Sequence, residues 1–215
     1  MHIFLILVIL SNIYLQITPA SEGAKELVEK NSKKTSQELT QETILKDYSI
    51  AVNLQIISNG AKTKTDVYPF EKVFLESGYK EVNKALQESK YYFQREIALP
   101  TQVPPVNFTH NFGRISHSFG KENDVFEITY INENLGHNHY QIRVKPVKYK
   151  VEFSEEKINQ RIKLSDGNEA IYSTKLPLDL LAFEKDGLQY ILLVDKKISK
   201  TVTINVLVDI ANSIK

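Results

Sequence analysis

The sequence predicts an α+β domain in which an antiparallel sheet is packed by a C-terminal helix and is preceded by a helical hairpin. Three observations predict this class. Apolar and polar residues alternate with a period of two over long stretches after residue 105, as they do in strands with one buried face. Two Asp-Gly pairs, Asp166-Gly167 and Asp186-Gly187, separate such stretches and are typical of tight hairpin turns. The last fifteen or so residues place apolar side chains at helical spacing.

The first twenty residues, "MHIFLILVILSNIYLQITPA", predict an export signal. An apolar run from Ile3 to Leu10 is followed by Thr18-Pro19-Ala20, which suits signal peptidase because small residues are preferred before the cleaved bond. A spanning helix needs roughly 20 apolar residues, and the polar Ser11 and Asn12 interrupt this run. We therefore expect a signal peptide over residues 1–20, cleavage after Ala20, and a secreted or cell-surface protein.

Residues 21–42 are polar, mixed in charge and free of aromatic side chains, which predicts a linker. We interpret 43–98 as a mainly helical segment. Its first part, 43–60, is ambiguous because Ile50, Val52 and Leu54 alternate as in a strand while Val52 and Ile56 also share a helix face.

A helical hairpin is predicted over residues 66–97. Pro69 suits the first turn of a helix, and Gly78 stands where a left-handed residue would end it. The second helix, 79–97, has one apolar stripe along its length. That stripe consists of Val82, Ala85, Leu86, Ser89, Phe93 and Ile97. The prolines at 100, 104 and 105 mark the junction with a sheet domain over 99–215.

The sheet is predicted from strands near 126–130 and 140–145 and from two hairpins that turn at the Asp-Gly pairs. We expect one buried face and one solvent-exposed face. The buried face is predicted to contain Phe126, Ile128, Tyr130, Ile142, Val144, Tyr172, Phe183, Tyr190 and Leu192. The C-terminal helix is predicted to place Leu207, Ile210, Ala211 and Ile214 on the sheet.

Composition excludes several classes of function. The chain has no cysteine, which excludes disulfides, thiolate metal sites, cysteine nucleophiles and a lipid-bearing cysteine. An exported chain without cysteine is typical of a Gram-positive bacterial surface. The 27 basic and 26 acidic residues nearly balance, so no general field attracts nucleic acid.

Several segments together resemble an uncharacterised family of exported or membrane-anchored domains from spore-forming Gram-positive bacteria. They are "LPTQVPPVNFTHNFGRI", "DGNEAIY", "LAFEKDGLQYIL" and "LVDIANSI", with "PFEKVFLESGYKEVNKAL" as a companion block. The resemblance covers about 99–215 and implies a domain similar in outline to periplasmic lipoprotein carriers, in which a curved sheet half-wraps a helix. No catalytic residues are established for the family, so the resemblance implies none here.

Four histidines, His110, His117, His137 and His139, fall within thirty residues and are the candidate metal ligands. In one strand, His137 and His139 would project to the same side about 7 Å apart, close enough to share a metal with a third ligand such as Glu133. Alternatively, the same alternation puts both histidines on the solvent face of the sheet, with Gly136 marking the loop that precedes the strand. We expect no metal and no cofactor, because a His-x-His pair without a spaced third ligand is a weak metal signal.

Six basic residues on consecutive predicted strands are the candidate binding residues for an anionic ligand. They are Arg143, Lys145, Lys148, Lys150, Arg161 and Lys163. On one exposed face they would suit a phosphate-rich wall polymer or a lipid head group. An ordinary charged edge that prevents strand aggregation is the alternative, with Glu152, Glu155 and Glu156 nearby.

The expected function is an exported cell-surface binding or interaction module with an unknown ligand and no catalytic activity. The sequence contains no His-Glu-x-x-His, phosphate-binding loop, Gly-x-Ser-x-Gly or Rossmann motif. Two alternatives stay open. One is a carrier that shelters an apolar ligand between sheet and helix, and the other is a metal-dependent enzyme that uses the region from His110 to His139.

Overall fold

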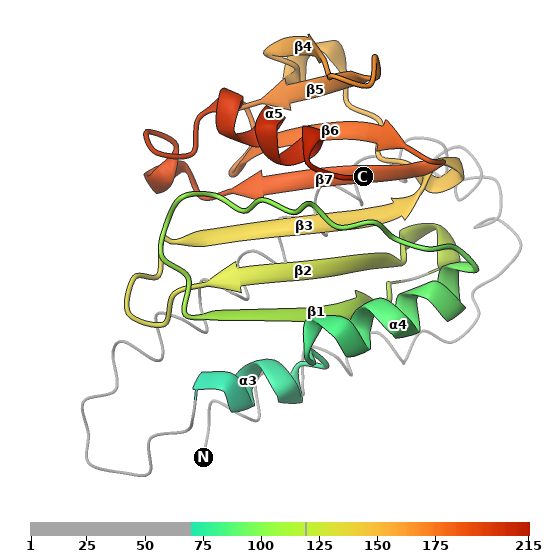
Figure 1. Cartoon of the computed structure of the whole chain (residues 1–215), viewed down its shortest axis with the longest axis vertical. Coiled ribbons are helices and arrows are strands. Elements are labelled where there is room, and N and C mark those ends of the chain that lie inside the picture. Colours follow the sequence, from blue (N-terminus) through green and yellow to red (C-terminus); the bar gives the residue numbers. More distant parts are fainter. Residues whose placement is uncertain (1–69, 119) are drawn as a thin grey trace, which may run out of the picture. The chain divides into compact units, whose positions relative to one another are not determined.

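The computed structural model describes residues 70–118 and 120–215. The predicted signal peptide, the linker and the ambiguous segment 43–60 lie outside these described residues. Within them, seven antiparallel strands form one sheet in the order β1-β2-β3-β7-β6-β5-β4, accompanied by three α-helices (Figure 1). The α+β class, the helical hairpin and the C-terminal helix near the sheet are as predicted.

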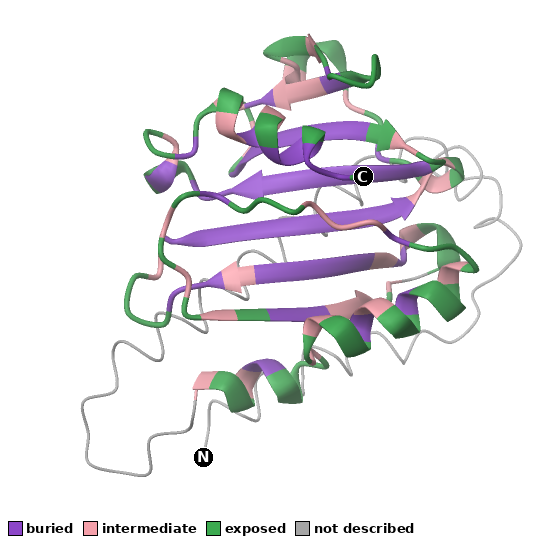
Figure 2. Cartoon of the chain, viewed as in Figure 1, coloured by how far each residue is buried: buried purple, intermediate pink, exposed green. Residues whose placement is uncertain are grey.

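Two meanders make the sheet. The first comprises β1 (His110–Ser116), β2 (Val125–Ile131) and β3 (His139–Pro146), and the second comprises β4 (Gln160–Lys163), β5 (Glu169–Ser173), β6 (Asp179–Lys185) and β7 (Leu188–Val194). The meanders join because the last strand of each, β3 and β7, pair antiparallel along their whole length. These two central strands are therefore the most deeply buried part of the sheet (Figure 2).

Both predicted Asp-Gly hairpins are confirmed. In the β6–β7 turn, Asp186 has φ 51° and Gly187 has φ 71°, the pair of positive values that a two-residue type I′ turn requires. In the β4–β5 turn, Gly167 has φ 89°, a conformation that glycine adopts without steric cost. The turn residues therefore determine the register of both hairpins.

Helices α3 (Phe70–Glu76) and α4 (Val82–Phe93) lie on opposite faces of edge strand β1. Phe74 of α3 stacks on Phe112 at 5.1 Å between ring centroids, whereas Ala85 of α4 faces the adjacent Gly113. Between the helices, Lys80 exchanges two backbone hydrogen bonds of 2.9 Å with Gly113. The hairpin thus clasps the edge of the sheet, which protects part of an otherwise open strand.

The clasp depends on glycine at position 113. A Cβ atom there would come within 2.8 Å of the Cβ of Ala85, closer than packed atoms tolerate. Since Ala85 itself is completely buried, the two small side chains set how closely α4 approaches β1.

The first sheet face carries the main core, and its predicted composition is confirmed. Seven of the nine predicted residues are buried, and Tyr130 and Tyr172 are partly buried against the same cluster. Helix α5 (Ile204–Asn212) covers this face with Leu207, Ile210 and Ala211, and Ile214 joins them just after the helix ends. Each of these four predicted side chains is at most 3% exposed. Helix α4 packs on the same cluster through Ala85, so 70–98 and 99–215 share one core.

The prediction that the second face is exposed to solvent is wrong. His139, Gln141, Arg143 and Lys145 alternate as expected, yet all four are at most 7% exposed. Beside them Val151 joins a second apolar cluster with Leu178, Leu180, Ala182, Ile191 and Leu193. Alternation identifies which residues share a face, but it does not show whether other segments cover that face.

Two other details differ from the sequence prediction. Strand β1 was not predicted, and α4 ends at Phe93 instead of near residue 97. Gln94 adopts a left-handed conformation with φ 52° and donates its backbone N–H to Lys90, which closes the helix. None of the helices in the described part of the chain is long and apolar enough to cross a membrane.

Replacing Phe183 by Ala tests the core assignment. Phe183 is 3% exposed and stacks on Tyr190 at 5.4 Å, so the variant should lose about 3 to 5 kcal/mol of unfolding free energy in urea. Leu135→Ala is the control, because Leu135 is 44% exposed and should cost less than about 1 kcal/mol. Similar losses for the two variants would contradict this core.

Candidate functional site

The strongest polar constellation in the described residues is centred on Glu127 in the middle of β2. The register places Glu127 opposite Arg114 of β1 on one side and Arg143 of β3 on the other, so all three side chains share the second face. Glu127 is completely buried and Arg143 is 4% exposed. One carboxylate is therefore enclosed between two guanidinium groups.

Three groups converge on that carboxylate. Arg114 Nε donates a hydrogen bond of 2.6 Å to Glu127 Oε1, and the hydroxyl of Tyr79 donates one of 2.7 Å to the same oxygen. Arg143 Nη2 lies 3.2 Å from Oε2. These contacts offset part of the large cost of removing the charges from water.

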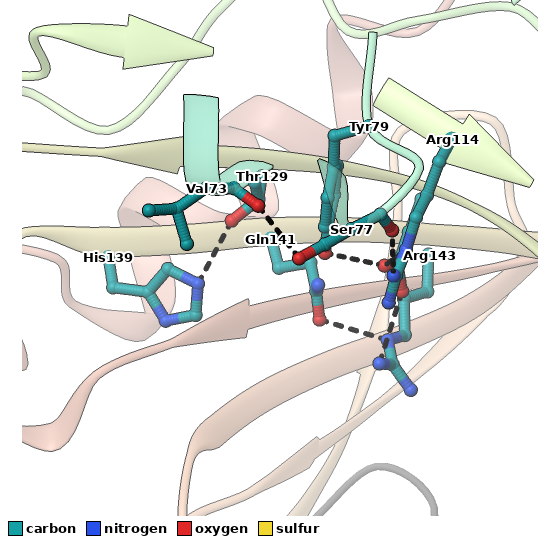
Figure 3. A network of polar contacts seen from close by, with 9 residues as sticks. Val73, Ser77, Tyr79, Arg114, Thr129, His139, Gln141 and Arg143 are labelled. Atoms are coloured by element: carbon teal, nitrogen blue, oxygen red, sulfur yellow. Dashed lines mark hydrogen bonds and ion pairs between the residues drawn. The ribbon is translucent and has the colours of Figure 1, made fainter. Parts of the chain in front are cut away.

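The network ties the connection between α3 and α4 to the sheet. Arg114 Nη1 donates to the backbone carbonyl of Ser77 at 3.0 Å, and its guanidinium lies 4.2 Å from the ring centroid of Tyr79. Arg143 Nε donates to Gln141 Oε1 at 2.9 Å (Figure 3). Figure 3 shows Tyr79, Arg114 and Arg143 close to Ser77, the residue that follows α3.

Electrostatics keep Glu127 ionised. Burial alone raises the pKa of its carboxyl, but the charges of Arg143 and Arg114 and the hydrogen bond from Tyr79 bring it below the ordinary 4.5. Burial, followed by the Glu127 charge, raises the pKa of Tyr79 well above 10.0. Neither group is suited to proton transfer near neutral pH, so the network acts as a structural clamp.

The histidines that lie close together in the sequence do not form a cluster in the structure. His139 begins β3 and is buried, with Nε2 3.0 Å from Thr129 Oγ1. His137 lies in the preceding turn, partly exposed, and its carbonyl accepts the backbone N–H of His139. The prediction that both project from one strand is therefore wrong, because the strand starts two residues later than assumed.

His110 and His117 stand at opposite ends of β1, roughly 23 Å apart for seven residues of extended chain. His110 Nε2 lies 3.3 Å from Glu71, and His117 Nδ1 lies 3.3 Å from Asp124. Across residues 70–118 and 120–215 no three His, Asp or Glu side chains form a group able to hold a metal.

A second polar cluster surrounds Asp124 at the β1–β2 end of the sheet. Asp124 is 3% exposed and accepts hydrogen bonds from the hydroxyl of Tyr92 and from the backbone N–H of Ser118, besides its contact with His117. The bond to Asp124 and burial raise the pKa of Tyr92 to about 12. This cluster anchors the last turn of α4 to the loop that follows β1.

The six predicted binding residues do not form one exposed surface. Arg143 and Lys145 are buried, so their predicted exposure is wrong. Lys145 donates to the carbonyl of Glu122 at 2.7 Å, and burial together with Arg143 lowers its pKa to about 8. Both groups belong to the interior of the second face.

The other four predicted cations are exposed. Lys150 lies between Glu152 and Glu184, at 3.2 and 3.0 Å. Arg161 likewise pairs with Glu155 and Glu169. Only Lys148 and Lys163 of this set have no carboxylate partner in the described part of the chain.

Sequence reasoning missed the roles of Tyr79, Arg114 and Glu127. The available signal was an acidic residue inside an apolar strand, "VFEITYI", flanked in the sequence by strands that carry arginine. Since the pairing register is a tertiary property, the sequence could not show that these charges face each other.

No protein-family model, curated protein or solved structure matches the chain. The site is therefore interpreted from its own geometry.

Replacing Glu127 by Gln should destabilise the protein by about 3 to 5 kcal/mol, because two buried guanidinium groups lose their counter-charge. Urea unfolding at neutral pH measures the loss. Glu88→Gln is the matched control, since Glu88 pairs with Lys80 at the surface and should cost less than about 1 kcal/mol. A loss below 1 kcal/mol for Glu127→Gln would contradict the clamp.

Acid should destabilise the protein through His139. Burial, the largest cause, lowers its pKa from 6.5 to about 4. The unfolded chain therefore binds a proton that the folded chain excludes, and stability falls as the pH drops from about 6.5 to 4. The loss amounts to about 3 kcal/mol at 1.36 kcal/mol per pKa unit.

Two measurements check this pH dependence. In NMR titrations, the ring signals of His139 should not shift until the pH approaches 4. Thermal unfolding of His139→Gln, which keeps a hydrogen-bonding group near Thr129, should lack this part of the acid sensitivity. A His139 midpoint near 6.5 would refute the assignment.

Proposed function

We propose that the chain is an exported binding module that acts outside the cytoplasmic membrane on an anionic partner, either a wall polymer or a membrane surface, and that it is not an enzyme. The apolar run from Ile3 to Leu10 and the small-residue site ending at Ala20 support export. The resemblance to exported domains of Gram-positive spore formers supports the same location and suggests membership of that family.

One observation carries the binding proposal: both faces of the sheet are filled by the chain's own side chains. On the first face, α5 packs directly on the strands through Leu207 and Ile210. On the second face, Glu127 forms ion pairs with both Arg114 and Arg143. Recognition is therefore assigned to exposed strand connections and edges, where uncompensated lysines such as Lys148 and Lys163 remain.

The two alternatives receive less support. A carrier needs space for an apolar ligand between sheet and helix, and there Ala211 and Ile214 join the packed core. A metal enzyme using the region from His110 to His139 needs converging ligands, whereas His110, His117 and His139 each contact a different residue.

The test has two parts. Amino-terminal sequencing of protein secreted by a Gram-positive host should begin at Ser21, whereas Met1 in a membrane fraction would replace export with anchoring. The secreted protein should also be retained on a phosphate-bearing resin at low salt and released as salt screens the charges. Equal passage over phosphate-bearing and uncharged resins would contradict an anionic partner.

A further inference from the structure

A second group of lysines lies at the end of the sheet opposite the Asp124 cluster. Antiparallel pairing places the β2–β3, β5–β6 and β7–α5 connections at this end (Figure 1). The β5–β6 connection, 174–178, and the β7–α5 connection, 195–203, together contain four lysines and one aspartate. We define the end-lysine surface as Lys175, Lys196, Lys197 and Lys200, all of which are exposed.

Hydrogen bonds bring the two connections together. Lys196 Nζ donates to the carbonyl of Thr174 at 2.6 Å, which places its ammonium group beside Lys175. Lys175 Nζ donates to the carbonyl of Ile158 at 3.0 Å. A neutral carbonyl orients an ammonium group without cancelling its charge, so both lysines keep a positive charge at the surface.

Carboxylates do not neutralise this surface. In the described part of the chain, none of the four ammonium groups lies within ion-pair distance of an acid. The nearby Asp195 and Asp179 are at most 6% exposed, and each has another partner. Asp195 accepts the backbone N–H of Lys197 at 2.8 Å, and Asp179 accepts the hydroxyl of Ser199 at 2.5 Å.

Those two aspartates also hold the connection in place. Asp195 caps the short 3₁₀ helix η6 (Lys196–Ile198), and the bond from Ser199 ties the following turn to the start of β6. A fixed backbone loses less conformational entropy when a ligand binds. The lysines therefore project from ordered backbone. The two connections that carry them lie at the ends of β5 to β7, and the distance from β5 to β7 is about 10 Å, or two strand spacings.

We propose that the end-lysine surface binds a linear phosphate-rich polymer, an inference that rests on the proposed function and names its partner. Regularly spaced phosphates can contact several ammonium groups at once, which raises affinity through multivalency. None of the large apolar side chains exposed in the described residues lies on 174–178 or 195–203. The surface therefore offers charge without the apolar element that strengthens insertion into a bilayer.

The experiment measures binding of the full chain to poly(glycerol phosphate) by titration calorimetry. Lys197→Gln/Lys200→Gln removes two charges whose ammonium groups make no hydrogen bond in the described part of the chain. Each lysine is worth about five-fold at an anionic surface, about 1 kcal/mol, so the double variant should bind about 25-fold more weakly. Lys197→Arg/Lys200→Arg should stay within about two-fold of the wild type, since the charge is kept.

Lys84→Gln/Lys121→Gln is the matched control, because it removes the same charge from exposed lysines that belong to neither proposed binding surface and should change affinity less than about two-fold. Equal weakening by both double variants would overturn the inference in favour of a general charge effect. Binding to phosphatidylglycerol vesicles but not to the polymer would overturn it in favour of a membrane.

The outcomes also separate this inference from the proposed function. If the chain binds phosphate resin but Lys197→Gln/Lys200→Gln binds the polymer like the wild type, the end-lysine surface is wrong and the anionic binding module stands. If the wild-type chain binds neither resin, polymer nor vesicles, the proposed function itself fails.

Discussion

The enclosure of Glu127 between Arg114 and Arg143 is the constraint on which the first half of the sheet depends. An ionised carboxylate in the interior is tolerable only when fixed donors replace its water, and here β1, β3 and the α3–α4 connection each contribute a donor. The same contacts that satisfy the charge therefore specify the order β1-β2-β3 and hold Tyr79 against them. In this region, the pairing of the Glu127 carboxylate and the order of strands β1, β2 and β3 depend on the same contacts.

The clasp of α3 and α4 around β1 follows from that constraint. A strand at the edge of a sheet invites pairing with other chains, and the backbone bonds of Lys80 to Gly113 occupy part of this edge. Small side chains at Gly113 and Ala85 allow one helix to approach, while Phe74 on Phe112 holds the other on the opposite face. At the other edge, β4 is short and exposed, and Arg161 pairs there with two glutamates, a charged edge of the kind that resists aggregation.

The charged residues of the molecule therefore fall into two groups, those buried on the sheet and those exposed on the strand connections. Charged side chains on the second face are held by internal partners, so they serve the fold: Arg143 pairs with Glu127, and Lys145 donates to the carbonyl of Glu122. The lysine ammonium groups on the connections stay available to solvent or to a ligand. Their neighbours are neutral carbonyls and buried aspartates instead of surface acids. A nearly neutral chain can in this way present a locally basic surface, which net charge alone conceals.

Local chemistry by itself determined much of this protein. The Asp-Gly turns, the alternation of Phe126 and Ile128, and the stripe from Leu207 to Ile214 depend on neighbours close in the sequence, and each predicted its element correctly. Tertiary structure alone decided the fate of the second face, the separation of His137 from the β3 face, and the partners of Glu127. The alternation of apolar and polar residues is the same whether a sheet face is exposed to solvent or covered. Whether a charged side chain lies in water or beside an opposite charge depends on the register between distant strands and on the packing of other segments.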